Sequence, residues 1–280
     1  KGLNVAVAFG LPGVLMAIAL FVFWLGRNKY ISIKPAGWQL YKKELFSKKG
    51  GEMVVKLLPI YIFLAVFWSL FDQTSGAWVL QAKSDLMIKD INLFFTTVSV
   101  YPSQLGFLNS LFILIFIPVF SYFVYPFLGK FIKLNYIKKI GIGLFIGALS
   151  FAVIAWVQVK MDNGIAMNIS WQVLGYILLT AAEIMVSITS LEFSYTQAPN
   201  SMKSFILSFW LVAVAIGNLF TALVNLFMIK EDGSLWLEGA SYFWFFTILM
   251  LVAAVLFFIV NRNYKEETFI QSKEALIEIE

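Results

Sequence analysis

Seven stretches of this 280-residue sequence are apolar over a length close to, or above, the roughly 20 residues that an α-helix needs to cross a membrane. They run over residues 3–25, 54–80, 105–128, 137–159, 171–194, 204–228 and 241–260. The whole chain is 60% hydrophobic with a mean hydropathy of +0.83. A soluble domain is only about 45–50% apolar. The sequence therefore predicts an all-α membrane protein embedded in a lipid bilayer.

The composition excludes several classes of functional site. The chain contains neither cysteine nor histidine, which rules out disulfides, thiolate nucleophiles, His-based metal sites and Ser-His or Cys-His catalytic pairs. The sequence also lacks a phosphate-binding glycine loop, a metal-ligand cluster and a nucleic-acid-binding motif. We therefore expect a protein that is not an enzyme, that holds no cofactor or metal, and that binds no nucleic acid.

The basic residues predict how the chain is oriented in the membrane. If the loops alternate between the two sides, sixteen of the 21 Lys and Arg residues fall on one side, eight of them in the linker after the first span. Cytoplasmic loops carry an excess of Lys and Arg. We therefore expect a multi-pass protein of the cell (inner) membrane, with the linker and the C-terminus in the cytoplasm.

The long basic linker divides the chain unequally. One apolar stretch precedes it and six follow it, as in the second half of a twelve-helix transporter. The expected organisation is a first span over residues 1–26, a cytoplasmic linker over 27–53, a six-helix bundle over 54–261 and a cytoplasmic tail over 262–280. The first residue is Lys, so we expect the chain to start inside a larger protein, after a missing N-terminal helix bundle. The alternative is a seven-helix sensor or receptor that does not transport.

Glu183 is a carboxylate inside the fifth apolar stretch, close to its middle. A carboxylate at this depth is costly, so it is usually found facing a cavity, a partner charge or a proton path. Ser187 and Ser190 follow at helical spacing, which predicts a polar stripe along one face. The alternative is a carboxylate that caps a helix or lies at the membrane interface.

Asp72 follows the aromatic run FWSLF in the second apolar stretch. It lies about 27 Å along a helix that starts in the cytoplasm, so we expect it near the outer face. There it could pair with a basic group on another helix and close an outer gate. Trp68 and Phe71 should lie on the same face. The alternative is an interfacial belt of aromatic residues beside a solvated Asp72.

Two further residues are ambiguous from the sequence alone. Asn109 is the one strong amide in the run from Gln104 to Phe120. An amide in hydrocarbon is often a contact between helices, and it could equally bind a polar substrate. Trp210, on its own, would indicate packing.

Several motifs together resemble the proton-coupled oligopeptide transporter family of the major facilitator superfamily. They are FWSLFDQ followed by WVLQA, LNSLFI, YPFLGK and above all SLEFSYTQAPNSMKS. The last is similar to the sequences of animal di- and tripeptide transporters, and the opening FGLPGVLMAIALFVFWLG is similar to the family's sixth helix. The resemblance implies a major facilitator C-terminal six-helix bundle, preceded by the last helix of the N-terminal bundle.

The resemblance also implies a function and a set of site residues. Members of the family import di- and tripeptides with protons, by alternating access between two helix bundles. Glu183 matches the glutamate that binds the amino group of the peptide, and Asp72 matches the acidic half of an outer gate. Other positions match substrate-binding residues of the family: Ser187, Asn109, Trp68, Phe71 and Trp210.

The sequence departs from the family pattern at several points. The ExxER motif of the first helix, which couples transport to protons, is absent, so we expect no transport by this chain alone. Animal relatives pair a basic residue at the position of Lys56 with an Asp where this chain has Ser121. The resemblance thus assigns Lys56 to an inner gate without that partner.

Overall fold

The computed structural model describes residues 5–29, 39, 42–43, 46–93, 96–198, 202–228, 235–262 and 264. The chain forms two units, one of residues 1–40 with 271–280 and one of residues 41–270. The first contains helix α1 (Val5–Leu25). Much of the predicted linker and nearly all of the predicted tail lie outside the described residues.

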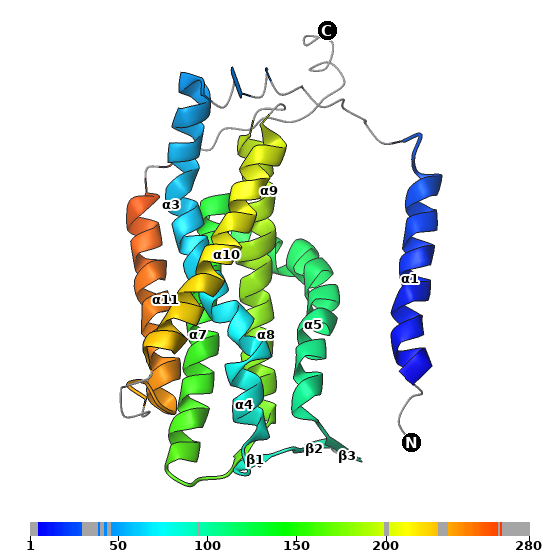
Figure 1. The fold of residues 1–280 in the computed structure, drawn as a ribbon, viewed down its shortest axis with the longest axis vertical. Coiled ribbons are helices and arrows are strands. Elements are labelled where there is room, and N and C mark those ends of the chain that lie inside the picture. Colours follow the sequence, from blue (N-terminus) through cyan, green and yellow to red (C-terminus); the bar gives the residue numbers. More distant parts are fainter. Residues whose placement is uncertain are drawn as a thin grey trace. The chain divides into compact units, whose positions relative to one another are not determined.

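The second unit contains six helical spans that are long and apolar enough to cross a membrane, which confirms the all-α membrane class (Figure 1). The spans run over Gly50–Lys83, Pro102–Gly129, Tyr136–Asp162, Ser170–Gln197, Lys203–Phe227 and Ala240–Val260. The apolar part of α1, Gly10–Leu25, is shorter than these six spans. Each predicted apolar stretch thus forms a helix.

Three of the spans are interrupted by turns of another helical type. The first consists of α3 (Lys48–Phe71), a 3₁₀ turn η1 (Asp72–Ser75) and α4 (Ala77–Lys83). The second begins with a 3₁₀ turn η2 (Pro102–Gln104) and continues with α5 (Leu105–Val119), a π-helical turn η3 (Phe120–Val124) and α6 (Tyr125–Gly129). The fourth consists of α8 (Ser170–Glu183), a π-helical turn η4 (Ile184–Ile188) and α9 (Thr189–Gln197). The continuous spans are α7 (Tyr136–Asp162), α10 (Lys203–Phe227) and α11 (Ala240–Val260).

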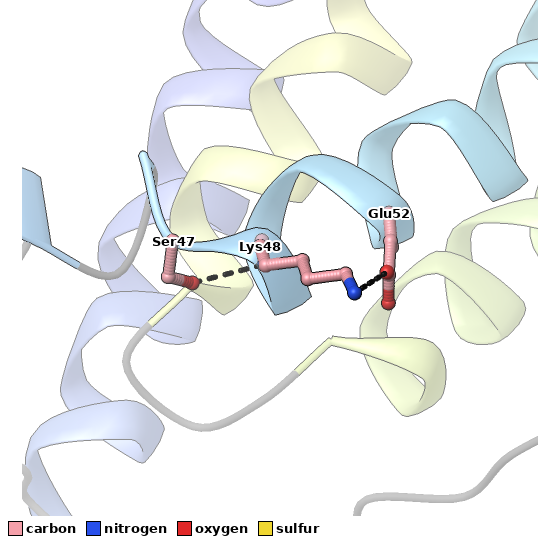
Figure 2. A network of polar contacts seen from close by, with 4 residues as sticks. Ser47, Lys48 and Glu52 are labelled. Atoms are coloured by element: carbon pink, nitrogen blue, oxygen red, sulfur yellow. Dashed lines mark hydrogen bonds and ion pairs between the residues drawn. The ribbon is translucent and has the colours of Figure 1, made fainter.

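Helix α3 starts at Lys48, earlier than the predicted boundary at Val54, because local contacts stabilise its first turn. The Ser47 hydroxyl accepts a hydrogen bond of 3.0 Å from the Gly50 amide, as an N-cap does. Lys48 and Glu52 then form an exposed ion pair of 3.9 Å, four residues apart (Figure 2). Such an exposed ion pair adds little to stability, so the N-cap at Ser47 contributes more to the start of the helix.

Helix α7 lies at the centre of the bundle and packs against α8 and α11, while α3 packs against α10 and α11 (Figure 1). Glycines allow the closest approaches. A Cβ atom on Gly217 of α10 would clash with the backbone oxygen of Ala65 in α3. A Cβ atom on Gly143 of α7 would clash with the side chains of Met185 and Val186 in η4. The interior between these helices is filled by large buried side chains, including Phe67, Leu144, Phe151, Ile154 and Phe246.

The connections at one end of the bundle contain short strands that an all-α expectation did not include. Strands β2 (Asp90–Leu93) and β3 (Thr96–Ser99) form an antiparallel hairpin. Strands β1 (Met87–Ile88) and β4 (Met167–Asn168) pair in parallel and join two connections far apart in sequence. The strand pairing gives hydrogen-bond partners to backbone N–H and C=O groups of the connections, which lie outside the helices.

A chain of side-chain hydrogen bonds holds this same end together. Gln172 donates to Gln81 at 2.7 Å, Gln81 donates to Gln158 at 2.9 Å, and Gln158 donates to Asp162 at 2.8 Å. The Asp162 carboxylate also accepts from the backbone N–H of Ala240 at 2.8 Å, at the start of α11. These bonds connect α8, α4, α7 and α11.

Candidate functional site

Glu183 is the last residue of α8 and is directly followed by the π-helical turn η4. Its carboxylate is half-buried and accepts a hydrogen bond of 2.8 Å from the amide of Asn109 on α5. The same amide also donates to the hydroxyl of Thr180 at 3.1 Å. Turns of the π type are rare and often lie at functional sites. The two polar residues that the sequence singled out on separate spans therefore meet.

Asn109 makes a contact between two helices, which is one of the two interpretations that the sequence allows. It bonds only to groups of α8 in the contacts described, and by doing so it fixes the orientation of Glu183. Both interpretations stay open, because an amide that orients a carboxylate also lies beside whatever that carboxylate binds. Thr180 was not predicted, although its position three residues before Glu183 places it on the same helix face.

The three predicted aromatic residues form a second group. The rings of Trp68 and Phe71, both on α3, lie edge to face with centroids 5.1 Å apart. Trp210 on α10 meets Trp68 in the same way at 5.7 Å. The indole N–H of Trp68 is buried and has no hydrogen-bond partner among the described residues. It is therefore a free donor within this aromatic cluster.

The predicted polar stripe of Glu183, Ser187 and Ser190 is broken by the π-helical turn. Ser187 lies inside this turn and is half-buried, whereas Ser190 is fully buried and accepts a hydrogen bond of 2.9 Å from the Trp210 indole. The π-helical turn changes the angular spacing on which the stripe was based. Ser190 thus contacts the aromatic group through Trp210, and this role was missed from the sequence.

Asp72 and Lys56 lie toward opposite ends of the first span. Asp72 begins the 3₁₀ turn η1 and is half-buried. The ammonium group of Lys56 lies 5.5 Å from the centroid of the Tyr264 ring. Asp72 directly follows Phe71, a member of the aromatic group.

Comparison with known proteins gives a consistent result. The profile described as the POT family matches residues 47–245. Solute carrier family 15 member 1 of Mus musculus is 30% identical over 191 residues, which are 56% of this chain and 26% of that protein. Solute carrier family 15 member 2 of Danio rerio is 34% identical over 187 residues, which are 55% of this chain and 25% of that protein. The matched part thus spans about a quarter of these relatives.

Solved structures agree over nearly the whole chain. The match to an auto-inhibited POT family peptide transporter covers 95% of this chain and 66% of that transporter's chain, with a TM-score of 0.73 and 25% identity. The match to the POT family transporter PepTSo covers 92% of this chain and 65% of that transporter's chain, with a TM-score of 0.71 and 28% identity. These likenesses confirm the predicted fold class of a bundle from this transporter superfamily.

Proposed function

The chain belongs to the POT family, and from this premise we propose that it forms the C-terminal part of a proton-coupled symporter of di- and tripeptides. The remaining helices belong to an N-terminal bundle, of which α1 is the last helix. The transporter resides in the cell (inner) membrane, with the linker 27–53 and the tail in the cytoplasm. The family match does not favour the alternative of a seven-helix sensor or receptor.

The observation that carries the proposal is the hydrogen bond between Asn109 and Glu183. The hydrogen bond from the Asn109 amide fixes one oxygen of the Glu183 carboxylate and leaves the other oxygen for a ligand. The α-ammonium group of a peptide supplies the opposite charge, and the attraction is strong where water is excluded. Glu183 is thus the amine-binding residue, with Asn109 and Ser187 beside it.

The aromatic group forms the wall for the side chains of the peptide. Trp68, Phe71 and Trp210 present broad apolar faces that accept many side chains. The unpaired indole N–H of Trp68 is a donor that a peptide oxygen can satisfy. Asp72 acts as the acidic half of an outer gate, and Lys56 belongs to an inner gate. Each of these roles rests on the resemblance to the family together with the positions described above.

The test is Glu183→Gln in the complete transporter, with Glu192→Gln as the matched control. Glu192 lies on the same span but is exposed and accepts a hydrogen bond from Tyr136 at 2.9 Å. Removing one partner of a buried charge pair costs about 3–5 kcal/mol, which is roughly a 10²–10³-fold loss of affinity or more. We expect Glu183→Gln to abolish dipeptide uptake in proteoliposomes without reducing membrane insertion, while the Glu192 variant transports.

A peptide with a blocked amino terminus separates the charge pair from other effects. It lacks the cation, so it should bind weakly both to the wild type and to the Glu183 variant. Uptake of free dipeptides by Glu183→Gln at the wild-type rate would show that Glu183 is not the amine site.

A further inference from the structure

A cavity lies at the end of the bundle that carries η1, α4 and the start of α11. Its volume is about 730 Å³, within the range of sites for small ligands. It is bordered by η1 and α4 of the first span and by parts of α7, α10 and α11. Asp72 lines it, but Glu183, Asn109, Trp68, Phe71 and Trp210 do not. Of the residues used in the proposed function, the cavity therefore shares only the gate residue Asp72.

The cavity contains a buried hydrogen-bond acceptor without a donor. Gln73 lines the cavity and is only 5% exposed. Its side-chain N–H donates to the Ser69 carbonyl at 2.7 Å, but its Oε1 has no partner among the described residues. Buried polar atoms are nearly always paired, so an unpaired one calls for a donor from a ligand or water.

The neighbouring side chains do not supply that donor. The hydroxyl of Thr221 donates to the Ser69 carbonyl at 2.7 Å, and the amide of Gln81 donates within the hydrogen-bonded chain described above. The amide of Gln158 donates to Asp162. The Tyr242 hydroxyl is hydrogen-bonded to the side chain of Asn225. Among the described residues that line the cavity, Gln73 Oε1 is the buried side-chain polar atom without a hydrogen-bond partner.

The charges of the lining point the same way. Two carboxylates, Asp72 and Glu238, line the cavity, and no Lys or Arg is found among the described residues that line it. Leu80, Met161 and Phe243 give apolar walls between the polar groups. The described part of the chain holds no group of three His, Cys, Asp or Glu side chains that could bind a metal ion. An elongated ligand fits this lining better than a bare ion.

We propose that this cavity is a second ligand site, which binds an organic cation with a primary ammonium group on an apolar chain. The ammonium group has three donors and no acceptor, and it therefore complements Gln73 Oε1 and the two carboxylates. The apolar chain lies along Leu80 and Phe243. The ring of Tyr242 can add a cation–π contact.

The test uses the complete transporter without native cysteines, with a single cysteine introduced as Ala222→Cys. Ala222 lines the cavity and is exposed to it. N-ethylmaleimide labels the cysteine, and the rate is measured with n-pentylammonium or with uncharged 1-pentanol. We expect saturable protection by pentylammonium, slowing labelling about tenfold, as a site occupied near nine-tenths requires. Ser103→Cys, in the exposed turn η2 outside the cavity, should not be protected.

Gln73→Met then removes the unpaired acceptor while keeping a long side chain. We expect the half-protecting concentration of pentylammonium to rise about tenfold, which corresponds to the loss of one hydrogen bond to a charged group. Leu80→Met places the same side chain on the same wall, keeps Gln73, and should change this concentration little. If Gln73→Met does not insert, the double variant Asp72→Asn, Glu238→Gln tests the charges and should abolish protection.

Three results would overturn the proposal. One is the absence of protection at Ala222→Cys, which would mean that water alone fills the cavity. Another is equal protection by 1-pentanol, which would indicate an apolar site without charge selectivity. The third is unchanged protection in both the Gln73 and the double-carboxylate variants. None of these outcomes depends on Glu183, so the peptide site is tested separately.

Discussion

The indole N–H of Trp210 donates a 2.9 Å hydrogen bond to the hydroxyl of Ser190, a residue that is fully buried. The bond joins α10 to α9 and holds the Trp210 ring edge to face against Trp68. Ser190 in turn donates to the carbonyl of Ser187 at 3.0 Å. The orientation of an aromatic wall residue is thus fixed from the span that also carries Glu183.

We expect Trp210→Ala, in the complete transporter, to raise the KM for bulky dipeptides more than the KM for dialanine. An aromatic contact is worth about 0.5–1.5 kcal/mol, so the difference should be roughly twofold to tenfold. Ser190→Ala should shift the two KM values in the same direction by less, because the ring stays in place but loses its fixed orientation. Trp244→Ala, on a partly exposed face of α11, is the control. Equal changes for both substrates would mean that Trp210 only packs.

Asn109→Leu removes the donor to Glu183 while keeping a similar shape. A hydrogen bond to a charged group is worth about 1.5–3 kcal/mol, so we expect the dipeptide Kd to rise roughly tenfold to a hundredfold. Thr180→Val removes only the second acceptor of the Asn109 amide and should raise Kd by less than about fivefold. Calorimetric titration with a dipeptide measures both. A Thr180 variant as weak as the Asn109 variant would show that packing between α5 and α8, and not the carboxylate, is affected.

Gly217→Ala should destabilise the bundle, because its Cβ atom would clash with backbone atoms of α3 that cannot move aside. Overpacking of this kind costs about 1–3 kcal/mol. Gly106→Ala, on α5, is the matched control, since nothing lies within 4 Å of the position of its added Cβ atom. Thermal denaturation of the purified transporter should give a lower Tm for the Gly217 variant alone. Equal Tm values for the two variants would contradict the close contact of α3 and α10.

The predicted orientation can be tested with two single cysteines. Phe46 is 82% exposed just before α3, and Ser103 lies in the turn η2 at the start of the second span. We expect an impermeant thiol reagent to label Ser103→Cys, but not Phe46→Cys, in intact cells. Permeabilised cells should show labelling of both. Labelling of Phe46→Cys from outside would reverse the assignment of the linker to the cytoplasm.

The spans could be predicted from the sequence because each one depends on a local property, a run of apolar residues. The start of α3 was misplaced because residues 48–53 are not apolar, and their helix depends on the cap at Ser47. Strands β1 and β4 were missed because they pair across connections that are far apart in the sequence.

The candidate site was predicted in part. Isolated polar residues in apolar helices identified Glu183 and Asn109, but their direct contact depends on how two spans pack. The partner of Trp210 could not be predicted, because the π-helical turn changes which residues of the span share a face. The turn packs closely against Gly143 of α7, a contact between distant parts of the sequence. The unpaired oxygen of Gln73 could not be predicted, because it can be identified only when the positions of all neighbouring residues are known.

The π-helical turn Ile184–Ile188 also has a consequence for the length of the span. Such a turn holds one residue more than an α-helical turn, so it sets the angular phase between the two helical halves that it joins. Relative to a continuous α-helix, the extra residue shifts the residues of α9 by one position, about 100° on the helical wheel, with respect to Glu183. In the structure the same span bonds to α5 through Glu183 and Asn109, and to α10 through Ser190 and Trp210.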